Sequence, residues 1–151
     1  MEPAAARECD HSRVIDAPPA RVFKAIADPT HLTRWFGPDG FTSTFHEFDF
    51  RPGGLWRVDL HGPDGKTYPN EYVFLDIIEP KRVVIEHLSK DGSHHFILTI
   101  TLVAEGGQTR VGWRQVFDTA EHRDKVAAFV VPANEQNLDR LQAEVGNVRA
   151  P

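Results

Sequence analysis

The stretch from Phe41 to Phe117 constrains the fold most, because its apolar residues alternate with polar ones and turn-forming clusters interrupt it at short intervals. Alternation is the pattern of a β-strand with one buried face, and clusters of Gly, Pro and Asp form the turns between such strands. Short turns join neighbouring antiparallel strands, so the stretch predicts a meander. The predicted strands are residues 41–50, 55–61, 67–78, 82–88, 95–103 and 110–117.

Segments on both sides of this meander have helical spacing. A first strand at residues 11–16 is followed by predicted helices at 20–27 and 30–36, because proline suits a helix start and the residue before a proline ends one. Asp118 and Glu121 have the spacing of a helix N-cap, and the residues after them form one apolar stripe. The stripe consists of Val126, Phe129, Val130, Ala133, Leu138, Leu141 and Val145. Pro132 is expected to kink or split this helix.

These elements predict an α+β domain: a curved antiparallel sheet of about seven strands wraps round a long C-terminal helix, with two short helices between strands 1 and 2. No linker or repeat divides the 151 residues, so we expect a single domain over residues 10–146. Residues 1–9, which include the only cysteine, Cys9, and residues 147–151 are expected to be flexible ends.

Composition excludes several classes of protein. No apolar run approaches the roughly 20 residues of a membrane span. The formal net charge of −5 leaves no excess of cations to neutralise nucleic-acid phosphates. A single cysteine cannot form an internal disulfide, and the first residues lack the cationic and apolar segments of a secretory signal. We therefore expect a cytoplasmic protein with no nucleic-acid partner.

Side chains switch face at every strand residue, so a few polar positions assign the faces of the sheet. With Thr99 outside, Phe96 faces inward. The same rule places His87 on the inner face of the preceding strand, and Trp113 and Gln115 on the inner face of the last strand.

An outward Asp76 assigns the faces of strand 67–78 in the same way. The residues then expected inside are Glu71, Val73, Leu75 and Ile77. Those expected on the outer face, as an apolar surface suited to a homodimer, are Tyr72, Phe74 and Val84. In strand 41–50 the apolar positions change parity between Phe45 and Phe48, which predicts a β-bulge.

Four blocks of residues carry a resemblance to a known family. They are IDAPPARVFKAI at 15–26, residues 28–38, DFRPGG at 49–54 and IEPKRVV at 78–84. Over about residues 11–145 the chain resembles the START-like helix-grip superfamily. Within it, the chain is similar to the family named for activators of the heat-shock protein 90 ATPase, the Aha-type C-terminal domain. Many relatives carry Gly-Trp where this chain has Ala133-Asn134, so we expect either a larger cavity or compensation by Trp113 or Phe129.

The gap between the curved sheet and the last helix is the predicted site for a small molecule, because rings with a few polar groups form such sites. The residues predicted to line it are Trp35, Phe48, Glu71, His87, Phe96, Trp113, Gln115, Phe129 and Asn134. Within this set, Asn134 is expected to offer its amide to the interior. Glu71 is expected at the rim or beside a partner, since an unpaired buried charge is costly.

The leading hypothesis is non-catalytic binding of a small lipophilic or aromatic ligand. One alternative is a co-chaperone-like stress protein that acts on a heat-shock protein 90 homologue, as the resemblance implies. The other is a cyclase- or hydrolase-type enzyme with His87 or Glu71 as general acid or base. The sequence has no Gly-x-Ser-x-Gly segment, Walker loop or clustered metal ligands, so we predict no catalytic residue, metal or cofactor.

Overall fold

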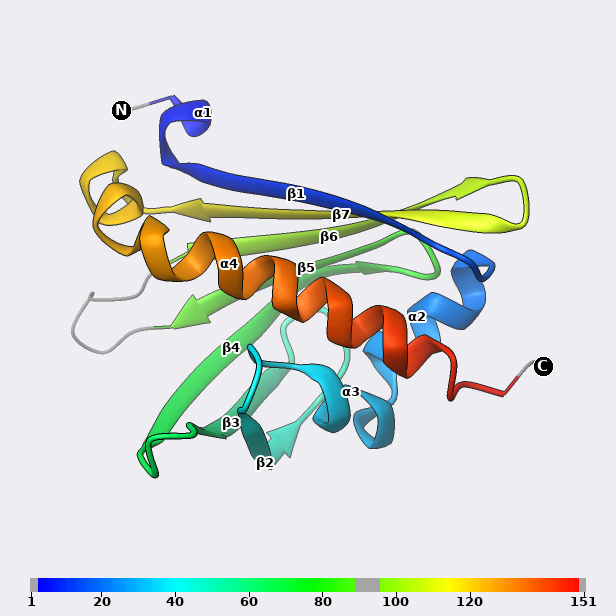
Figure 1. The fold of residues 1–151 in the computed structure, drawn as a ribbon, viewed down its shortest axis with the longest axis horizontal. Helices are drawn as coiled ribbons and strands as arrows, with labels where there is room; N and C mark the ends of the chain where they lie inside the picture. The colour runs from blue at the N-terminus through cyan, green and yellow to red at the C-terminus, as the bar shows by residue number, and fades with distance from the viewer. Residues whose placement is uncertain (1–2, 89–95, 150–151) are drawn as a thin grey trace.

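The computed structural model describes residues 3–88 and 96–149. Figure 1 shows a curved sheet crossed by one long helix, with shorter helices beside it. The helices are α1 (Ala4–Arg7), α2 (Pro19–Ala27), α3 (Pro29–Trp35) and α4 (Ala120–Val145). The strands are β1 (Glu8–Ile15), β2 (Thr42–Phe48), β3 (Leu55–His61), β4 (Thr67–Ile78), β5 (Arg82–Leu88), β6 (Phe96–Glu105) and β7 (Gln108–Phe117). The predicted connection at 89–94 lies outside the described residues.

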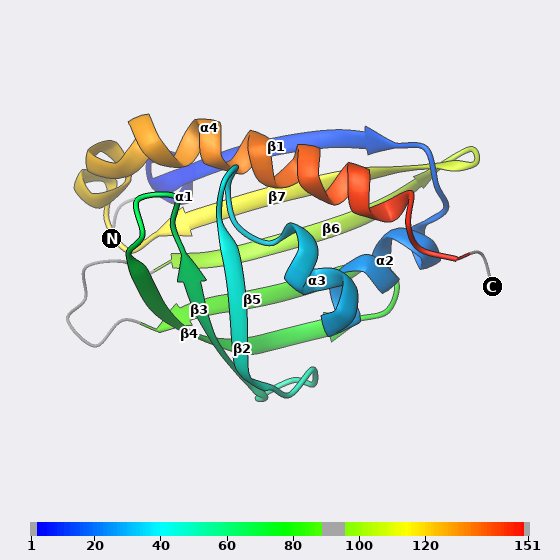
Figure 2. The ribbon, with the colours of Figure 1, turned by 60° about the horizontal axis from the view of Figure 1, so that its bottom comes forward.

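The described strands form one antiparallel sheet in the order β1-β7-β6-β5-β4-β3-β2. The meander from β2 to β7 is therefore as predicted, and β1 joins its far edge beside β7. The helix α4 lies against β1 and β7, with α2 and α3 beside it on the same face of the sheet (Figure 2). This confirms the predicted α+β helix-grip architecture. Residues 3–88 and 96–149 contain no helix of the length and hydropathy that a bilayer span requires.

Asp28 makes the sharp joint between α2 and α3. It is both the C-cap of α2 and the N-cap of α3. Its carboxylate accepts a hydrogen bond from the Thr30 amide at 2.9 Å. Pro29 follows at the first position of α3, where its missing N–H costs nothing. One Asp-Pro pair therefore ends one helix and begins the next.

The turn between β2 and β3 depends on a glycine. A Cβ on Gly54 would lie 1.9 Å from the Asp49 carbonyl oxygen, so no other residue fits there without moving the backbone. The Arg51 guanidinium donates to the Asp49 carboxylate at 2.7 Å, which braces the same turn. The Gly53 amide donates to the Phe74 carbonyl oxygen at 2.7 Å and so ties the turn to β4.

Two β-bulges shape the sheet, and only one was predicted. The register of β2 shifts between Phe45 and Glu47, which confirms the predicted bulge. A second shift lies between Phe74 and Asp76 in β4, and it leaves Leu75 without a partner on β5. Because an extra residue reverses the alternation, the face assignment from Asp76 holds for Ile77 but fails before the bulge.

In the part of β4 before the bulge, each residue lies on the opposite face of the sheet from the one predicted. Tyr72 and Phe74 are buried, with 4% and 1% of their surface exposed, instead of lying on the outer face. Glu71 and Val73 are not on the inner face, and Leu75 is 44% exposed. The homodimer surface predicted on this face therefore loses Tyr72 and Phe74 from its basis, and the dimer stays a prediction.

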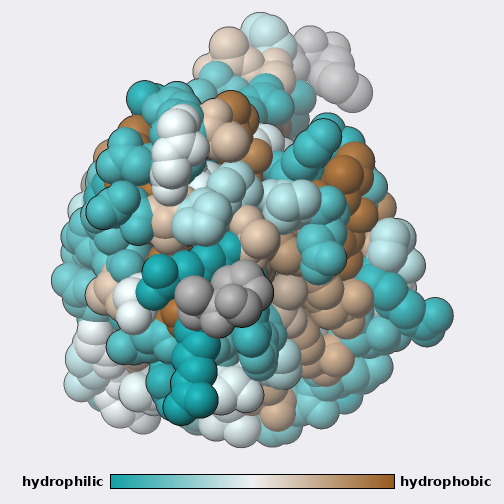
Figure 3. All heavy atoms as spheres, turned by 90° about the vertical axis from the view of Figure 1, so that its right-hand side faces the viewer, coloured by the Kyte–Doolittle hydropathy of each residue, from teal (hydrophilic) through white to brown (hydrophobic). Residues whose placement is uncertain are grey.

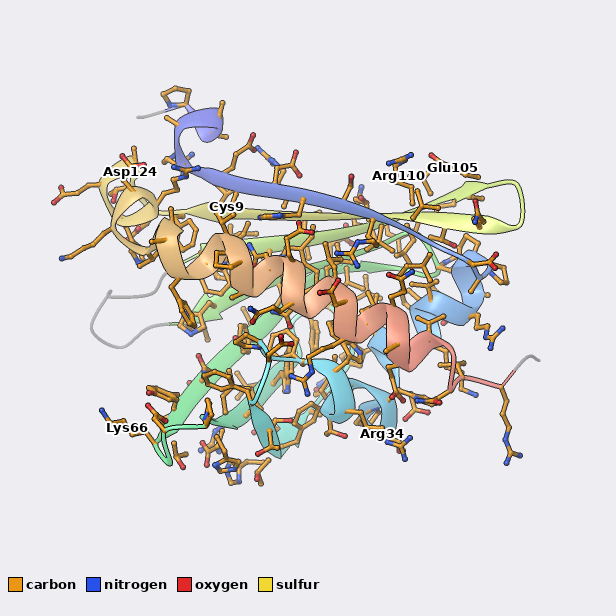
Figure 4. All side chains as sticks on the ribbon, viewed as in Figure 1. Cys9, Arg34, Lys66, Glu105, Arg110 and Asp124 are labelled. Carbon is orange, nitrogen blue, oxygen red and sulfur yellow. The ribbon has the colours of Figure 1, made fainter. Side chains whose placement is uncertain are left out.

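Residues expected in flexible ends take part in the fold. The strand β1 begins at Glu8, earlier than predicted, and Cys9 lies within it opposite Gln115 with 3% of its surface exposed (Figure 4). Near the other end, Val148 is 2% exposed and its carbonyl oxygen accepts from Arg21 at 2.9 Å. These residues are bound to the sheet and to α2.

The helix α4 continues through Pro132, so the predicted split does not occur. Its N-cap is Thr119, whose hydroxyl accepts from the His122 amide at 3.0 Å, instead of the predicted Asp118. The Asp118 carboxylate contacts the Thr119 amide and the His122 ring.

Candidate functional site

A continuous series of aromatic rings lies between the inner face of the sheet and the helices. Adjacent ring centroids are 4.8–6.1 Å apart. In order, the rings belong to Trp113, Trp35, Phe36, Trp56, Tyr72, His87 and Phe96. Each ring pair at such distances adds about 0.5–1.5 kcal/mol beyond the area it buries. The series therefore forms a cohesive apolar lining on this face.

The end of α3 places two rings at the centre of this series. Trp35 is fully buried and contacts Trp113 on β7, whereas the next residue, Phe36, contacts Trp56 on β3 and Tyr72 on β4. The β7 side and the β3–β4 side of the curved sheet thus meet at α3. The local cause is the helix end at Trp35, after which the chain is extended at Phe36.

A pair of amides joins α4 to the sheet. The Asn134 side chain donates to Gln115 Oε1 on β7 at 3.0 Å, and the two residues are only 5% and 7% exposed. The inward positions predicted for Asn134 and Gln115 are therefore correct. A buried amide keeps more hydrogen-bonding capacity than one bond uses. The pair can accept or donate further bonds to a polar group in the interior.

His87 lies on the inner face of β5 as predicted, stacked on Phe96 with an interplanar angle of 6°. Its Nε2 donates to Asn70 Oδ1 at 2.9 Å. Glu71 lies on the other side of β4, 3.8 Å from the Arg57 guanidinium, with 36% of its side chain exposed. The acid–base pair of His87 and Glu71 is therefore not formed, and the inward position predicted for Glu71 is wrong because the bulge at Leu75 reverses the alternation.

The sequence prediction missed Tyr72 and Trp56 as residues of this interior. Burial raises the pKa of the Tyr72 phenol well above its ordinary value, so the group stays neutral at physiological pH. Tyr72 and Phe74 have the same parity in β4, so the one error at the bulge misplaced both. Trp56 is 1% exposed and stacks on Tyr72 at 4.8 Å.

Phe129 is the predicted lining residue that the structure moves outside. It is 62% exposed on α4, so the compensation expected from Phe129 does not occur. Phe48 is partly buried and packs on Trp56 and Phe74, at the β2 end of the interior. Trp35 and Trp113 are likewise buried and Phe96 is partly buried, so ring size and, for the strands, alternation predicted the burial of these side chains.

Two of the three tryptophans bury an indole N–H that has no acceptor among the described residues. These are Trp56 and Trp113, which are 1% and 2% exposed. The Nε2 of His11, which faces Trp113 across the β1–β7 ladder, is also without a partner in residues 3–88 and 96–149. Each such group costs about 1–3 kcal/mol when it is left unbonded in the interior. The interior therefore holds two indole donors without an acceptor among the described residues.

Ion pairs fasten α4 around this interior. His11 Nδ1 donates to the Glu135 carboxylate at 2.5 Å, and Arg13 reaches both Glu135 and Asp139. On the α3 side, His31 Nδ1 donates to the buried Glu144 carboxylate at 2.6 Å. Long-range partners from β1 and α3 thus set the position of the helix over the sheet.

Among the surface hollows are two in which some of the polar groups already serve the fold. The larger, about 540 Å³, lies between α2 and the β4–β5 turn. Figure 3 shows the molecule from the right-hand side of Figure 1, with hydrophobic residues among hydrophilic ones on that side. Asp28 of the larger hollow caps α3. The smaller, about 280 Å³, lies beside α1, where Arg7 donates to the Phe117 carbonyl and Arg114 to Glu8. The interior, with its unmet donors, is the stronger candidate for binding.

Comparison with known proteins agrees with this architecture. A family described as "Activator of Hsp90 ATPase homolog 1-like protein" matches residues 16–146. No curated protein matches significantly. A solution structure of a protein from Arthrobacter aurescens has a TM-score of 0.88 at 22% identity, covering 97% of this chain and 90% of the other. Crystal structures from Nitrosomonas europaea (TM-score 0.85, 18% identity, 97% and 99% covered) and Rhodobacter sphaeroides (0.84, 24%, 97% and 97%) show the same fold.

Proposed function

The chain belongs to the Activator of Hsp90 ATPase homolog 1-like family, and from that premise we propose that it binds a small lipophilic or aromatic molecule between the sheet and α4, without catalysis. The observation that carries the proposal is the unbroken series of rings, bordered by the amide pair of Asn134 and Gln115. An apolar lining with a few placed polar groups is the usual composition of a small-molecule site.

The position of Asn134 supports the same proposal. The resemblance implies a Trp at this position in many relatives. The exposed Phe129 does not replace that ring, and Trp113 is the other large ring buried in this interior. An amide side chain is smaller than an indole, so position 134 fills less of the space beneath α4 than a Trp fills. The amide also places a polar group there, which orients a ligand.

The proposal predicts that a Trp at position 134 blocks binding. We expect Asn134→Trp to weaken binding of the neutral aromatic dye N-phenyl-1-naphthylamine at least tenfold in a fluorescence titration, because the larger indole occupies the space beneath α4. Phe129→Trp is the matched control, since it adds the same ring to the exposed side of the same helix and should leave the affinity within twofold. Overpacking costs about 1–3 kcal/mol, so Asn134→Leu, a smaller filling residue, is measured if Asn134→Trp unfolds.

Equal dye affinity in Asn134→Trp, in Phe129→Trp and in the unmodified protein would contradict the proposed site.

Native and denaturing mass spectrometry of freshly purified protein adds an independent measurement. We expect a small molecule that departs only on unfolding. Its mass would give the chemical class of the ligand.

The family description also raises a heat-shock protein 90 homologue as a partner, which we propose only as the alternative. A pull-down with the homologue of the source cell and its ATPase rate test this. Binding together with a change in the ATPase rate would favour the alternative over a ligand carrier.

The single cysteine, Cys9, is free and buried, which suits the reducing cytoplasm that we propose as the location.

A further inference from the structure

We propose that the ligand is a neutral ring compound whose carbonyl oxygen accepts a hydrogen bond from the indole N–H of Trp113 or Trp56. This inference rests on the proposed function and specifies the chemistry of the same site. It follows from a difference among the tryptophans of this chain, from the surroundings of the two unbonded indoles, and from the charges that the interior holds.

The three tryptophans have similar burial but different hydrogen bonding. Trp35 Nε1 donates to the Ala25 carbonyl oxygen at 2.8 Å, so the fold itself supplies its acceptor. Trp56 and Trp113 have no acceptor among the described residues, although they are as deeply buried. Buried indole N–H groups normally find a partner. The two unmet donors are therefore suited to an acceptor that the chain does not contain.

The neighbours of the two indoles explain why the protein leaves them unbonded. Trp56 lies between Phe48 on β2 and Tyr72 on β4, and it contacts Phe36 from the end of α3. Trp113 contacts Trp35, and its cross-strand neighbour His11 has turned its Nδ1 toward Glu135. Rings pack on Trp56, and Trp35 packs on Trp113, so we infer that the acceptor comes from a molecule that enters among these rings. Binding then requires the rings beside the indole nitrogen to shift.

The charges of the interior select the kind of acceptor. Among the described residues, the buried polar and charged side chains are His87, Thr109, Gln115, Asn134, Asn137 and Glu144, with no lysine or arginine. A buried carboxylate without a cation is strongly disfavoured. A ketone or similar neutral carbonyl satisfies an N–H donor without bringing a charge.

A matched pair of soluble probes tests this chemistry. Indane and 1-indanone share one bicyclic skeleton and differ by the carbonyl oxygen. We expect 1-indanone to bind roughly threefold to tenfold more tightly than indane, the gain of one net hydrogen bond. The affinities are measured by titration of ¹⁵N-labelled protein in two-dimensional NMR spectra, where each tryptophan gives one indole N–H signal.

The same spectra identify the donor. Single Trp→Phe variants assign the three indole signals. We expect 1-indanone to move the proton signal of Trp113 or Trp56 downfield, as a new hydrogen bond does, and to leave the Trp35 signal in place. Indane should perturb the signals without this downfield shift. The corresponding variant, Trp113→Phe or Trp56→Phe, should then bind the two probes equally.

The outcomes separate this inference from the function on which it rests. If both probes bind with equal affinity and neither Trp113 nor Trp56 moves downfield, the carbonyl inference is wrong and ligand binding stands. A downfield shift confined to Trp35 also overturns it. If neither probe changes any signal from the interior at millimolar concentration, the proposed function fails, and the inference fails with it.

Discussion

The two halves of α4, divided at Pro132, differ in how they are held. All of its buried residues lie after Pro132, from Ala133 to Val145. The first half has no buried residue and exposes Phe129 and Val131, with 62% and 38% of their surface accessible. Continuous helical hydrogen bonding therefore does not imply continuous packing.

The difference shows where the helix grips the sheet. The second half is fixed by hydrogen bonds from His11 to Glu135 and from His31 to Glu144, and by Arg140, which donates to the Gly37 carbonyl at 2.6 Å. The first half is tied to β1 by Arg123, which donates to the Glu8 carbonyl at 3.1 Å. Segments with few buried contacts open locally at lower free energy than the core, so we expect the first half to open before the second.

Truncation of a buried leucine tests the comparison most strongly. Leu138 is fully buried in the second half, so Leu138→Ala is expected to lower the free energy of unfolding by about 2–5 kcal/mol. Phe129→Ala removes a larger side chain from the first half but should change the free energy of unfolding by less than about 0.5 kcal/mol. Urea denaturation measures both. Similar losses from the two variants would show that the first half is packed as firmly as the second.

The two glutamates that pair with histidine sharpen the comparison within the second half. Glu144 is 7% exposed at its side chain and accepts from His31 and Asn147, so Glu144→Ala should cost about 1–3 kcal/mol. Glu135 is 47% exposed, and Glu135→Ala should cost less than about 1 kcal/mol. Thermal unfolding of both variants at pH 7 gives the ranking. A larger loss from Glu135→Ala would place the main fastening of α4 on β1 instead of α3.

Replacing the dividing proline tests the boundary between the two halves. Proline removes one helical hydrogen bond but also restricts the unfolded chain, so Pro132→Ala should raise the free energy of unfolding by about 1 kcal/mol. Pro29→Ala is the control, because Pro29 occupies the first position of α3 and its loss should slightly destabilise the protein. Both are measured by urea denaturation. Destabilisation by Pro132→Ala would mean that the fold needs the proline at this position.

Strand parity predicted the inner faces where strands are regular and failed where one is not. His87, Phe96, Trp113 and Gln115 come from β5, β6 and β7, whose described ladders with one another have no register shift. In β4 a single extra residue, Leu75, misplaced every position before it. A bulge in a strand of mixed composition leaves no signal of its own. The bulge near Phe45 was predictable only because large apolar residues flank it.

The sequence predicted which aromatic rings are buried in the candidate site. It did not predict which indole N–H groups lack a hydrogen-bond acceptor. Large aromatic residues at inward positions pointed to Trp35 and Trp113, since such rings are buried wherever they can be. Whether an indole N–H has an acceptor depends on backbone carbonyls brought near by the tertiary fold, as Ala25 is brought to Trp35. The partners of α4 are equally non-local, because His11 and Glu135 lie 124 positions apart in the chain. Helical spacing alone also could not exclude Phe129 from the buried stripe.

The pairing of β1 with β7 sets the order in which the chain can fold during its synthesis. Glu8 and Arg114 of this pair are 106 positions apart, so the edge strand leaves the ribosome long before its partner is made. Translation adds about 5–20 residues each second, which leaves β1 unpaired for several seconds. An unpaired strand edge can associate with other chains. The emerging chain thus depends on the polar residues of β1, such as Asp10, Ser12 and Arg13, to keep that edge in water until β7 arrives.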